Sequence, residues 1–424
     1  MDEVLESVMH DAKHFHLGAF ILKISGGYIM KFQEIEKLAS SIMEKAVSEK
    51  EVAGMNLLVL KDGGPVLSLQ SGYANLENKT PFAENTIMRL YSMSKPITAA
   101  CMMILMQRGL VDLNDPVSKF IPAFANQTYV NGNSLSLVNR QMTVHDLLFM
   151  TSGLSYGSDS AAGKATFDVF VEMDKRLFTD NAMTTREFAD RIGKNPLEFE
   201  PSSSFMYGVS ADILGALIEV ISGMSFAEFL KKEITDPLEM DDTEFFVPEE
   251  KQSRLAHVYK HTDDGFTLYT GNHLAIRNPM DTLPAFQSGG AGLVSTLPDY
   301  AHFGSMLLNG GSYKGHQILG PEIVRYFTQG SLQPWQQEAL SRNWGGLEGY
   351  SYGNLLRVMK DPSKAIMYTT LGEYGWDGWL GPYFSNHPDC NVTFLAGLQL
   401  TDAGTIPAVR RLRNAVLPRL KDNR

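Results

Sequence analysis

The segment from Ser92 to Gly109 constrains the fold more than any other part of the sequence. Nearly every residue at positions 97–106 is apolar or small, and Lys95 is the only charged side chain between Leu90 and Gln107. A serine and an early proline at the start, and a glycine at the end, are typical of helix termini. A helix that is apolar on all sides is stable only inside a sizeable domain. We therefore expect a large core around this helix.

Strand patterns stand near both ends of the chain, and helical patterns dominate between them. β-rich runs occupy positions 55–60 and 65–70 around a Gly turn, and later positions 350–358, 365–370, 379–385 and 392–400. Helical periodicity occupies positions 32–49, 143–153, 185–192, 210–222, 225–233, 298–308 and 408–420. This order predicts an α/β (α+β) fold, in which an antiparallel sheet built from both ends is flanked by helices and carries an inserted all-helical domain.

The same patterns suggest domain boundaries. We expect residues 31–111 and 281–424 to form the α/β domain and residues 112–280 to form the helical domain. Residues 1–30 do not join the pattern and are expected to be an N-terminal extension.

Charge and apolar runs limit the partners and the location of the protein. With 37 Lys and Arg against 48 Asp and Glu, the formal net charge is -11, so there is no overall basic field to bind a nucleic acid backbone. No run approaches the roughly 20 apolar residues that span a bilayer, and the N-terminus lacks the positive charge of a secretory signal. Cys101 and Cys390 sit in apolar runs and are expected to be buried thiols. These features favour the cytoplasm and no membrane partner, and leave the oligomeric state open.

Ser92 and Lys95 are the first candidates for chemistry. Residues three apart share one face of a helix, so the Lys95 amine is expected beside the Ser92 hydroxyl at the helix start, where backbone N–H groups stabilise an anion. A capping serine and a lysine that reaches out to solvent are the structural alternative. A buried lysine is rare unless it is paired or functional, which favours the chemical interpretation.

Two later segments add candidates. Tyr207 follows a polar run and precedes a helix, and a nearby lysine can drive a tyrosine toward phenolate, which accepts protons. Trp376, Asp377, Gly378 and Trp379 lie in a glycine-rich stretch that lets the backbone approach a ligand. Core packing of Tyr207 and of the tryptophans is the alternative for each.

The order of these motifs resembles the serine hydrolases of the class C β-lactamase and penicillin-binding fold. Ser92-Met-Ser-Lys95 opens a buried helix, Tyr207 follows about 115 residues later, and Trp376-Asp-Gly378 is expected to enter a late strand. The Trp-x-Gly third motif is similar to that of the family VIII carboxylesterases. Residues 143–154 and 289–293 also resemble the family, and the match spans about residues 32–420.

The resemblance implies a serine carboxylesterase that forms an acyl-enzyme on Ser92, with no cofactor and no metal. It implies that Lys95 and Tyr207 transfer the proton, and leaves open which of them is the base. It further implies that the backbone N–H groups of Ser92 and Trp379 form the oxyanion hole.

Two departures from the family bear on the substrate. The third motif of the β-lactamases carries a lysine that receives the carboxylate of the drug, whereas Trp376, Asp377 and Gly378 supply no cation, which favours a small neutral ester. The second motif has Val209 where Asn or Ser is usual, which removes a polar contact to an amide substrate unless Ser210 replaces it. The candidates for substrate binding are therefore Trp376, Asp377, Gly378 and Val209.

Other readings of the sequence remain as alternatives. A β-lactamase, a D-amino-acid peptidase or amidase, an acyltransferase and a binding protein without activity all fit the fold. Ser155 lies in a Gly-x-Ser-x-Gly match that lacks the preceding strand of an α/β-hydrolase elbow, so it is not expected to be the nucleophile. His257 and His261 lack the glutamate of a zinc-protease motif and are not expected to bind a metal.

Overall fold

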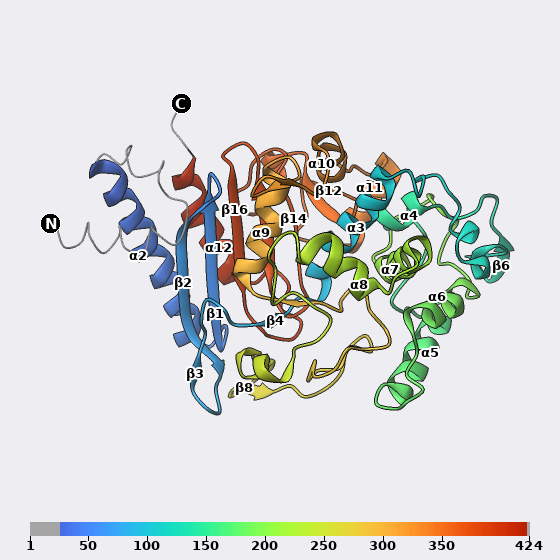
Figure 1. Ribbon diagram of the computed structural model, residues 1–424, viewed down its shortest axis with the longest axis horizontal. Helices are drawn as coiled ribbons and strands as arrows, with labels where there is room; N and C mark the ends of the chain where they lie inside the picture. Colours follow the sequence, from blue (N-terminus) through green and yellow to red (C-terminus); the bar gives the residue numbers. More distant parts are fainter. Residues whose placement is uncertain (1–25, 422–424) are drawn as a thin grey trace.

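The computed structural model describes residues 26–421 and is built around one eight-stranded antiparallel sheet (Figure 1). The order across the sheet is β12-β13-β14-β15-β16-β1-β2-β3. Its strands are β1 (Gly54–Lys61), β2 (Gly64–Asn75), β3 (Thr80–Pro81), β12 (Tyr350–Gly353), β13 (Leu356–Met359), β14 (Tyr374–Asp377), β15 (Tyr383–His387) and β16 (Val392–Gly397). Because β1 pairs with β16, the two ends of the chain meet in one sheet, as the sequence predicts.

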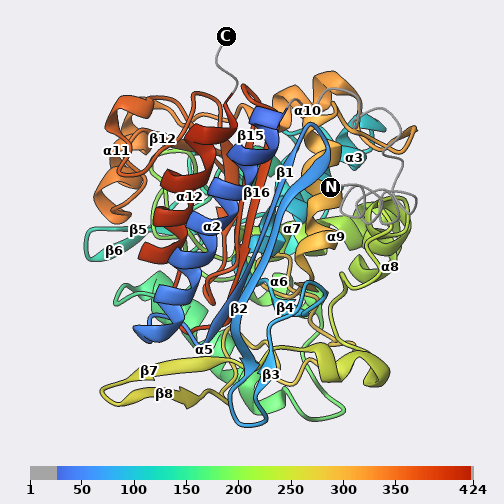
Figure 2. The same cartoon turned by 90° about the vertical axis from the view of Figure 1, so that its left-hand side faces the viewer.

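Two terminal helices cover one face of this sheet, side by side in Figure 2. They are α2 (Gly26–Ser48) and α12 (Pro407–Leu420). Apolar residues such as Ile35, Met43, Leu412 and Val416 pack from these helices against the strands. Helix α2 begins before the expected position 32, within the predicted N-terminal extension. The rest of that extension, residues 1–25, lies outside the described residues.

The opposite face of the sheet packs against α9 (Leu297–Leu308) and belongs to the main core, which continues through α3 (Lys95–Gln107). Eleven of the thirteen residues of α3 are buried, so the prediction of an apolar central helix is confirmed. A single turn of 3₁₀-helix, η3 (Tyr91–Ser94), precedes it and contains Ser92. Ser92 is therefore not the cap of α3, because Ser94 takes that position.

The stretch between the sheet segments contains more helix than strand, with α4 (Val144–Leu148), α5 (Ala161–Arg176), α6 (Thr185–Gly193), α7 (Ser210–Ser222) and α8 (Phe226–Leu230). The expectation that it is entirely helical needs correction, because it also carries two hairpins. These hairpins pair β5 (Thr128–Asn131) with β6 (Ser134–Leu137) and β7 (Tyr259–Thr262) with β8 (Gly265–Leu268). Tyr259 packs in the core beneath α2 and α12, so this second hairpin lies against the sheet side of the molecule.

Shorter elements complete the fold. They are β4 (Met88–Arg89), β9 (Val294–Ser295), β10 (Ser312–Tyr313), β11 (His316–Gln317), α10 (Pro321–Thr328), α11 (Pro334–Asn343), η4 (Val117–Lys119), η5 (Pro122–Phe124), η6 (Lys231–Thr235), η7 (Glu249–Arg254) and η8 (Pro362–Lys364). The pair β4 and β9 leads the chain into η3 and so fixes the approach to Ser92. The expected strand at positions 365–370 is wrong, since these residues form no strand.

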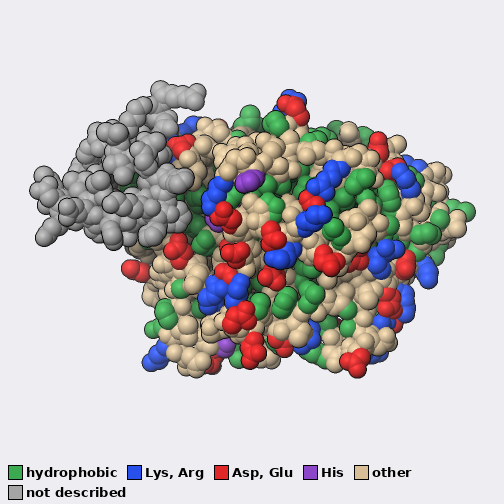
Figure 3. Space-filling view, viewed as in Figure 1, with side chains coloured by type: hydrophobic (Ala, Val, Ile, Leu, Met, Phe, Trp, Pro, Cys, Tyr) green, Lys and Arg blue, Asp and Glu red, His purple; other side chains and the backbone are tan. Residues whose placement is uncertain are grey.

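The surface has mixed character. Acidic and basic side chains are interspersed on the face in Figure 3. Within residues 26–421, no single helix has the length and apolar composition to cross a membrane. The segments Ser210–Ser222 and Phe226–Thr235 meet that test only as a pair, with a bend of 80° between them.

Candidate active site

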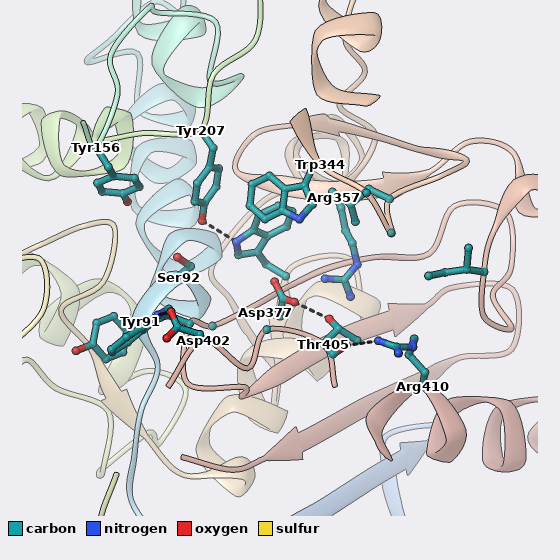
Figure 4. Close-up of a pocket in the computed structure, with 18 of the residues that line it drawn as sticks. Tyr91, Ser92, Tyr156, Tyr207, Trp344, Arg357, Asp377, Asp402, Thr405 and Arg410 are labelled. Atoms are coloured by element: carbon teal, nitrogen blue, oxygen red, sulfur yellow. Dashed lines mark hydrogen bonds between the residues drawn. The ribbon is translucent and has the colours of Figure 1, made fainter. Parts of the chain in front are cut away.

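Ser92 opens onto a cavity of about 540 Å³ between the sheet and the helical layer. The cavity wall includes Tyr207, Trp344, Arg357, Asp377 and Trp379. Figure 4 shows these side chains arriving from widely separated parts of the sequence. The fold therefore brings all three predicted motifs to one cavity.

Lys95 is completely buried directly behind Ser92. Its Nζ lies 3.1 Å from Ser92 Oγ, 3.0 Å from the Tyr156 hydroxyl and 2.8 Å from the carbonyl oxygen of Gly290. Burial lowers the pKa of Lys95 to about 7, although Asp212 and Asp377 act to raise it. A neutral amine has two N–H donors and one lone pair. The three oxygen atoms around Nζ, one carbonyl and two hydroxyls, can supply two acceptors and one hydroxyl donor, so they match the neutral amine. Lys95 can therefore act as a proton acceptor near neutral pH.

Asp212 on α7 supports the lysine through the backbone. It accepts hydrogen bonds from the Ser288 hydroxyl and, at 3.0 Å, from the N–H of Gly290, whose carbonyl binds Lys95. A side chain at Gly290 would meet Asp212 at 2.9 Å and the Tyr156 hydroxyl at 3.0 Å. A larger residue at this position would displace both side chains, so the packing favours glycine.

Tyr207 stands beside Ser92 among aromatic rings. Its hydroxyl accepts a hydrogen bond of 2.9 Å from Trp376 Nε1, and its ring meets Trp344 edge to face, with 4.8 Å between ring centres. Lys95 Nζ lies 4.6 Å from the centre of the Tyr207 ring. Burial raises the pKa of Tyr207, and hydrogen bonds with Ser92 and Trp376 oppose that rise without reversing it. The expected drive toward phenolate is therefore wrong, and Tyr207 keeps its proton at neutral pH.

The third motif lies at the end of β14, so it leaves a strand and does not enter one as expected. Trp376 is buried, Asp377 accepts a hydrogen bond from Thr405, and Trp379 follows on the cavity wall. A Cβ at Gly378 would lie 2.2 Å from the Leu90 carbonyl oxygen, so only glycine allows this backbone to pass the segment before Ser92.

The backbone N–H groups of Ser92 and Trp379 are the predicted oxyanion donors. Throughout the described part of the chain, neither group donates a hydrogen bond to another residue. The preceding residue, Tyr91, has a φ of 45°, in the left-handed region. Its ring packs edge to face on Trp379, with 4.9 Å between the ring centres. This contact packs the residue before Ser92 against Trp379.

Three residues considered from sequence lie away from the cavity wall. Val209 is completely buried in the main core, which corrects its assignment as a substrate-binding residue. Ser210 is also buried and lies 2.8 Å from the Ser152 hydroxyl, so it does not replace the missing polar contact. Ser155 donates to Glu198 at 3.0 Å, away from the lysine.

Several cavity residues are not among the candidates that the sequence predicted. Tyr156 binds Lys95, Arg357 comes from β13, and His273 stacks on Trp379 with 4.0 Å between the ring centres. Burial lowers the pKa of His273, although Asp402 acts to raise it. Tyr156 lies near Lys95 only because of the way residues 150–160 fold, so the sequence alone does not identify it.

We also looked for side chains placed close enough together to bind a metal ion. Among residues 26–421, no cluster of three or more His, Cys, Asp or Glu side chains has the arrangement to hold a metal ion.

Fold and site together define a serine hydrolase of the β-lactamase and penicillin-binding type. Residues 36–402 match the family model described as Beta-lactamase, and the chain belongs to that family. Among curated relatives, Protein Rv1367c of Mycobacterium tuberculosis is 28% identical over 336 residues, covering 77% of this chain and 81% of that protein. Esterase EstB of Burkholderia gladioli is 26% identical over 362 residues, covering 80% of this chain and 84% of EstB.

Solved structures show the same fold. EstCE1, described as a hydrolase with promiscuous acyltransferase activity, superposes with a TM-score of 0.76 at 24% identity, covering 91% of this chain and 99% of EstCE1. A family VIII carboxylesterase superposes with a TM-score of 0.65 at 16% identity, covering 91% of this chain and 97% of that structure. These similarities support the fold that the three motifs suggest.

Proposed function

We propose that the protein is a carboxylesterase that hydrolyses small short-acyl esters through an acyl-enzyme on Ser92. The observation that carries this proposal is the buried amine of Lys95, 3.1 Å from the Ser92 hydroxyl, with its pKa lowered to about 7. A general base works best when its pKa lies near the working pH. The similarity to Esterase EstB supports the choice of an ester substrate.

Each residue of the site has a separate role in the proposed ester hydrolysis. Neutral Lys95 takes the proton of Ser92 while Ser92 Oγ forms a bond to the acyl carbon. The N–H groups of Ser92 and Trp379 stabilise the negative carbonyl oxygen. When the ester C–O bond breaks, Tyr207 gives its hydroxyl proton to the leaving alkoxide and receives in its place the proton that Lys95 took from Ser92. Water then attacks the acyl carbon and gives a proton to Lys95. The bond between the acyl carbon and Ser92 Oγ breaks, Ser92 Oγ takes that proton back from Lys95, and a carboxylic acid leaves.

Lys95 is the base in this scheme. Burial raises the pKa of Tyr207, so this tyrosine is protonated at neutral pH and is suited to donate. Burial lowers the pKa of Lys95, so much of the amine is free to accept. The two groups share a contact and titrate as a coupled pair.

Acyl transfer to an alcohol is the second candidate, and the similarity of the fold to EstCE1 is the observation behind it. Hydrolysis of a β-lactam or amide is less favoured, because Trp376 occupies the third-motif position where those enzymes carry a cation.

Parallel assays separate these functions. Phenyl acetate, a cephalosporin and a D-alanyl dipeptide are incubated with the wild type and with Ser92→Ala, with and without added butanol. We expect rapid ester hydrolysis, little loss of the cephalosporin or dipeptide, and no activity in the variant. Faster turnover with formation of butyl acetate would support the acyltransferase instead, and ester hydrolysis that survives Ser92→Ala would overturn the proposal.

A further inference from the structure

Arg357 is a cation on the cavity wall that the proposed reaction does not use. It lies on β13, the strand next to β14, and its side chain is 2% exposed. In Figure 4 its guanidinium and that of Arg410 lie across Asp377 from Ser92 and Tyr156. Since Arg357 lines the cavity, the cavity gives a bound molecule access to it.

The charges around Arg357 do not balance. Glu373 is completely buried, and Arg413 binds it through two contacts of 3.1 Å and 2.7 Å. Arg357 reaches the same carboxylate through one longer contact of 3.4 Å. Burial favours a raised pKa for Glu373, but Arg413, His387 and Arg357 outweigh it and keep the group ionised. Burial also lowers the pKa of His387. Two guanidinium groups thus share one carboxylate, which leaves one buried positive charge.

Arg357 also has unused hydrogen-bond donors. Its Nη2 donates to Glu373 and, at 3.0 Å, to the carbonyl oxygen of Phe384, whereas Nε is buried with no partner in the described residues. The guanidinium is held over the Tyr383 ring, 4.6 Å from its centre. A buried cation with a fixed position and unpaired donors favours a charged oxygen ligand.

The acidic residues of the cavity are engaged elsewhere. Asp377 accepts from the Thr405 hydroxyl and Asp402 accepts from Trp379 Nε1 at 2.7 Å. In the part of the chain that the structure describes, neither forms an ion pair with Arg357 or Arg410. Among residues 26–421, the guanidinium of Arg410 donates only to the carbonyl oxygen of Thr405. Two guanidinium groups therefore face the cavity without a carboxylate of their own on its wall.

We propose that Arg357, assisted by Arg410, binds a carboxylate group of the substrate, remote from the ester bond that Ser92 attacks. This inference rests on the proposed esterase function and narrows its substrate class from neutral esters to esters that carry a carboxylate. It also changes the expectation from the third motif, because the cation comes from the neighbouring strand β13 and not from the motif itself.

The test compares esters that differ only in charge. Phenyl acetate is paired with 3-acetoxybenzoate, which carries the carboxylate on the alcohol part, and phenyl hexanoate is paired with monophenyl adipate, which carries it on the acyl part. At pH 8 we expect at least one charged ester to exceed its neutral partner at least tenfold in kcat/KM. The advantage should fall at least tenfold in Arg357→Gln and more weakly in Arg410→Gln.

Arg357→Gln leaves Glu373 paired with Arg413, so one positive charge then faces one negative charge in the buried cluster. The ratio of charged to neutral kcat/KM is also independent of the fraction of enzyme that is folded. Arg325→Gln is the matched control, since Arg325 is an exposed arginine of α10 that pairs with Glu322 outside the cavity, and both rates should be unchanged.

A binding measurement separates this inference from the esterase proposal. Calorimetric titration of Ser92→Ala with 3-hydroxybenzoate and phenol, and with adipate and hexanol, needs no turnover. Tighter binding of a carboxylate that is lost in Ser92→Ala/Arg357→Gln supports the site even if no ester is hydrolysed. If neutral esters are hydrolysed but no charged ester or carboxylate is preferred, or if a preference survives Arg357→Gln, the carboxylate site is overturned and the esterase proposal stands.

Discussion

The protonation of Lys95 offers the most quantitative test of the proposed chemistry. Its pKa falls from an ordinary 10.5 to about 7 on burial. At pH 7 about half of the Lys95 side chains are then neutral, whereas an ordinary lysine would be neutral in roughly one molecule in three thousand. Burial therefore raises the population of the free base on the order of a thousandfold.

The experiment measures kcat/KM for a neutral ester from pH 5 to pH 10. Because the neutral amine is the active form, log kcat/KM should rise with unit slope below about pH 7 and then level off. Lys95→Arg should lose at least about a thousandfold in kcat/KM at every pH, because a guanidinium stays protonated. A profile that is flat from pH 5 to 8, or one that falls above pH 7, would refute the assignment of Lys95 as the base.

Single substitutions test the surrounding contacts. Gly378→Ala would place a methyl group 2.2 Å from the Leu90 carbonyl oxygen and displace the oxyanion donor, so kcat should fall about a hundredfold while circular dichroism is unchanged; wild-type kcat would contradict this. Trp376→Phe removes the 2.9 Å hydrogen bond to Tyr207 and should lower kcat about tenfold in steady-state assays; an unchanged kcat would show that this bond does not matter. Tyr156→Phe removes an oxygen that stabilises the ammonium form, so the acid limb of the pH profile should move to lower pH; movement to higher pH would refute that role.

The parts of the fold that sequence predicted are those with strong local patterns. The apolar run of α3 and the alternation around the β1–β2 turn define a buried helix and a hairpin without help from distant residues. Helix α5 carried no clear pattern, and its start is set by the Ser160 hydroxyl, which accepts from the N–H of Gly163. The strand expected at 365–370 is also absent, because sheet pairing depends on neighbours that a single strand pattern does not specify.

The candidate site shows the same difference between contacts set by local sequence and contacts set by tertiary folding. Ser92 and Lys95 lie close together in sequence, so their contact follows from helical spacing. Tyr156, Arg357 and His273 reach the cavity only through tertiary folding, and no spacing rule relates them to Ser92. Val209 lies two positions after Tyr207 and yet faces the core. Sequence neighbourhood alone does not decide which side of a turn a residue faces.

The most direct test of the central claim is the identity of the nucleophile. The protein is treated with a fluorophosphonate probe, and the adduct is located by intact mass and peptide mapping. We expect one adduct, on Ser92, and its loss in Ser92→Ala. An adduct on Ser155, or no adduct at all on a folded protein, would contradict it.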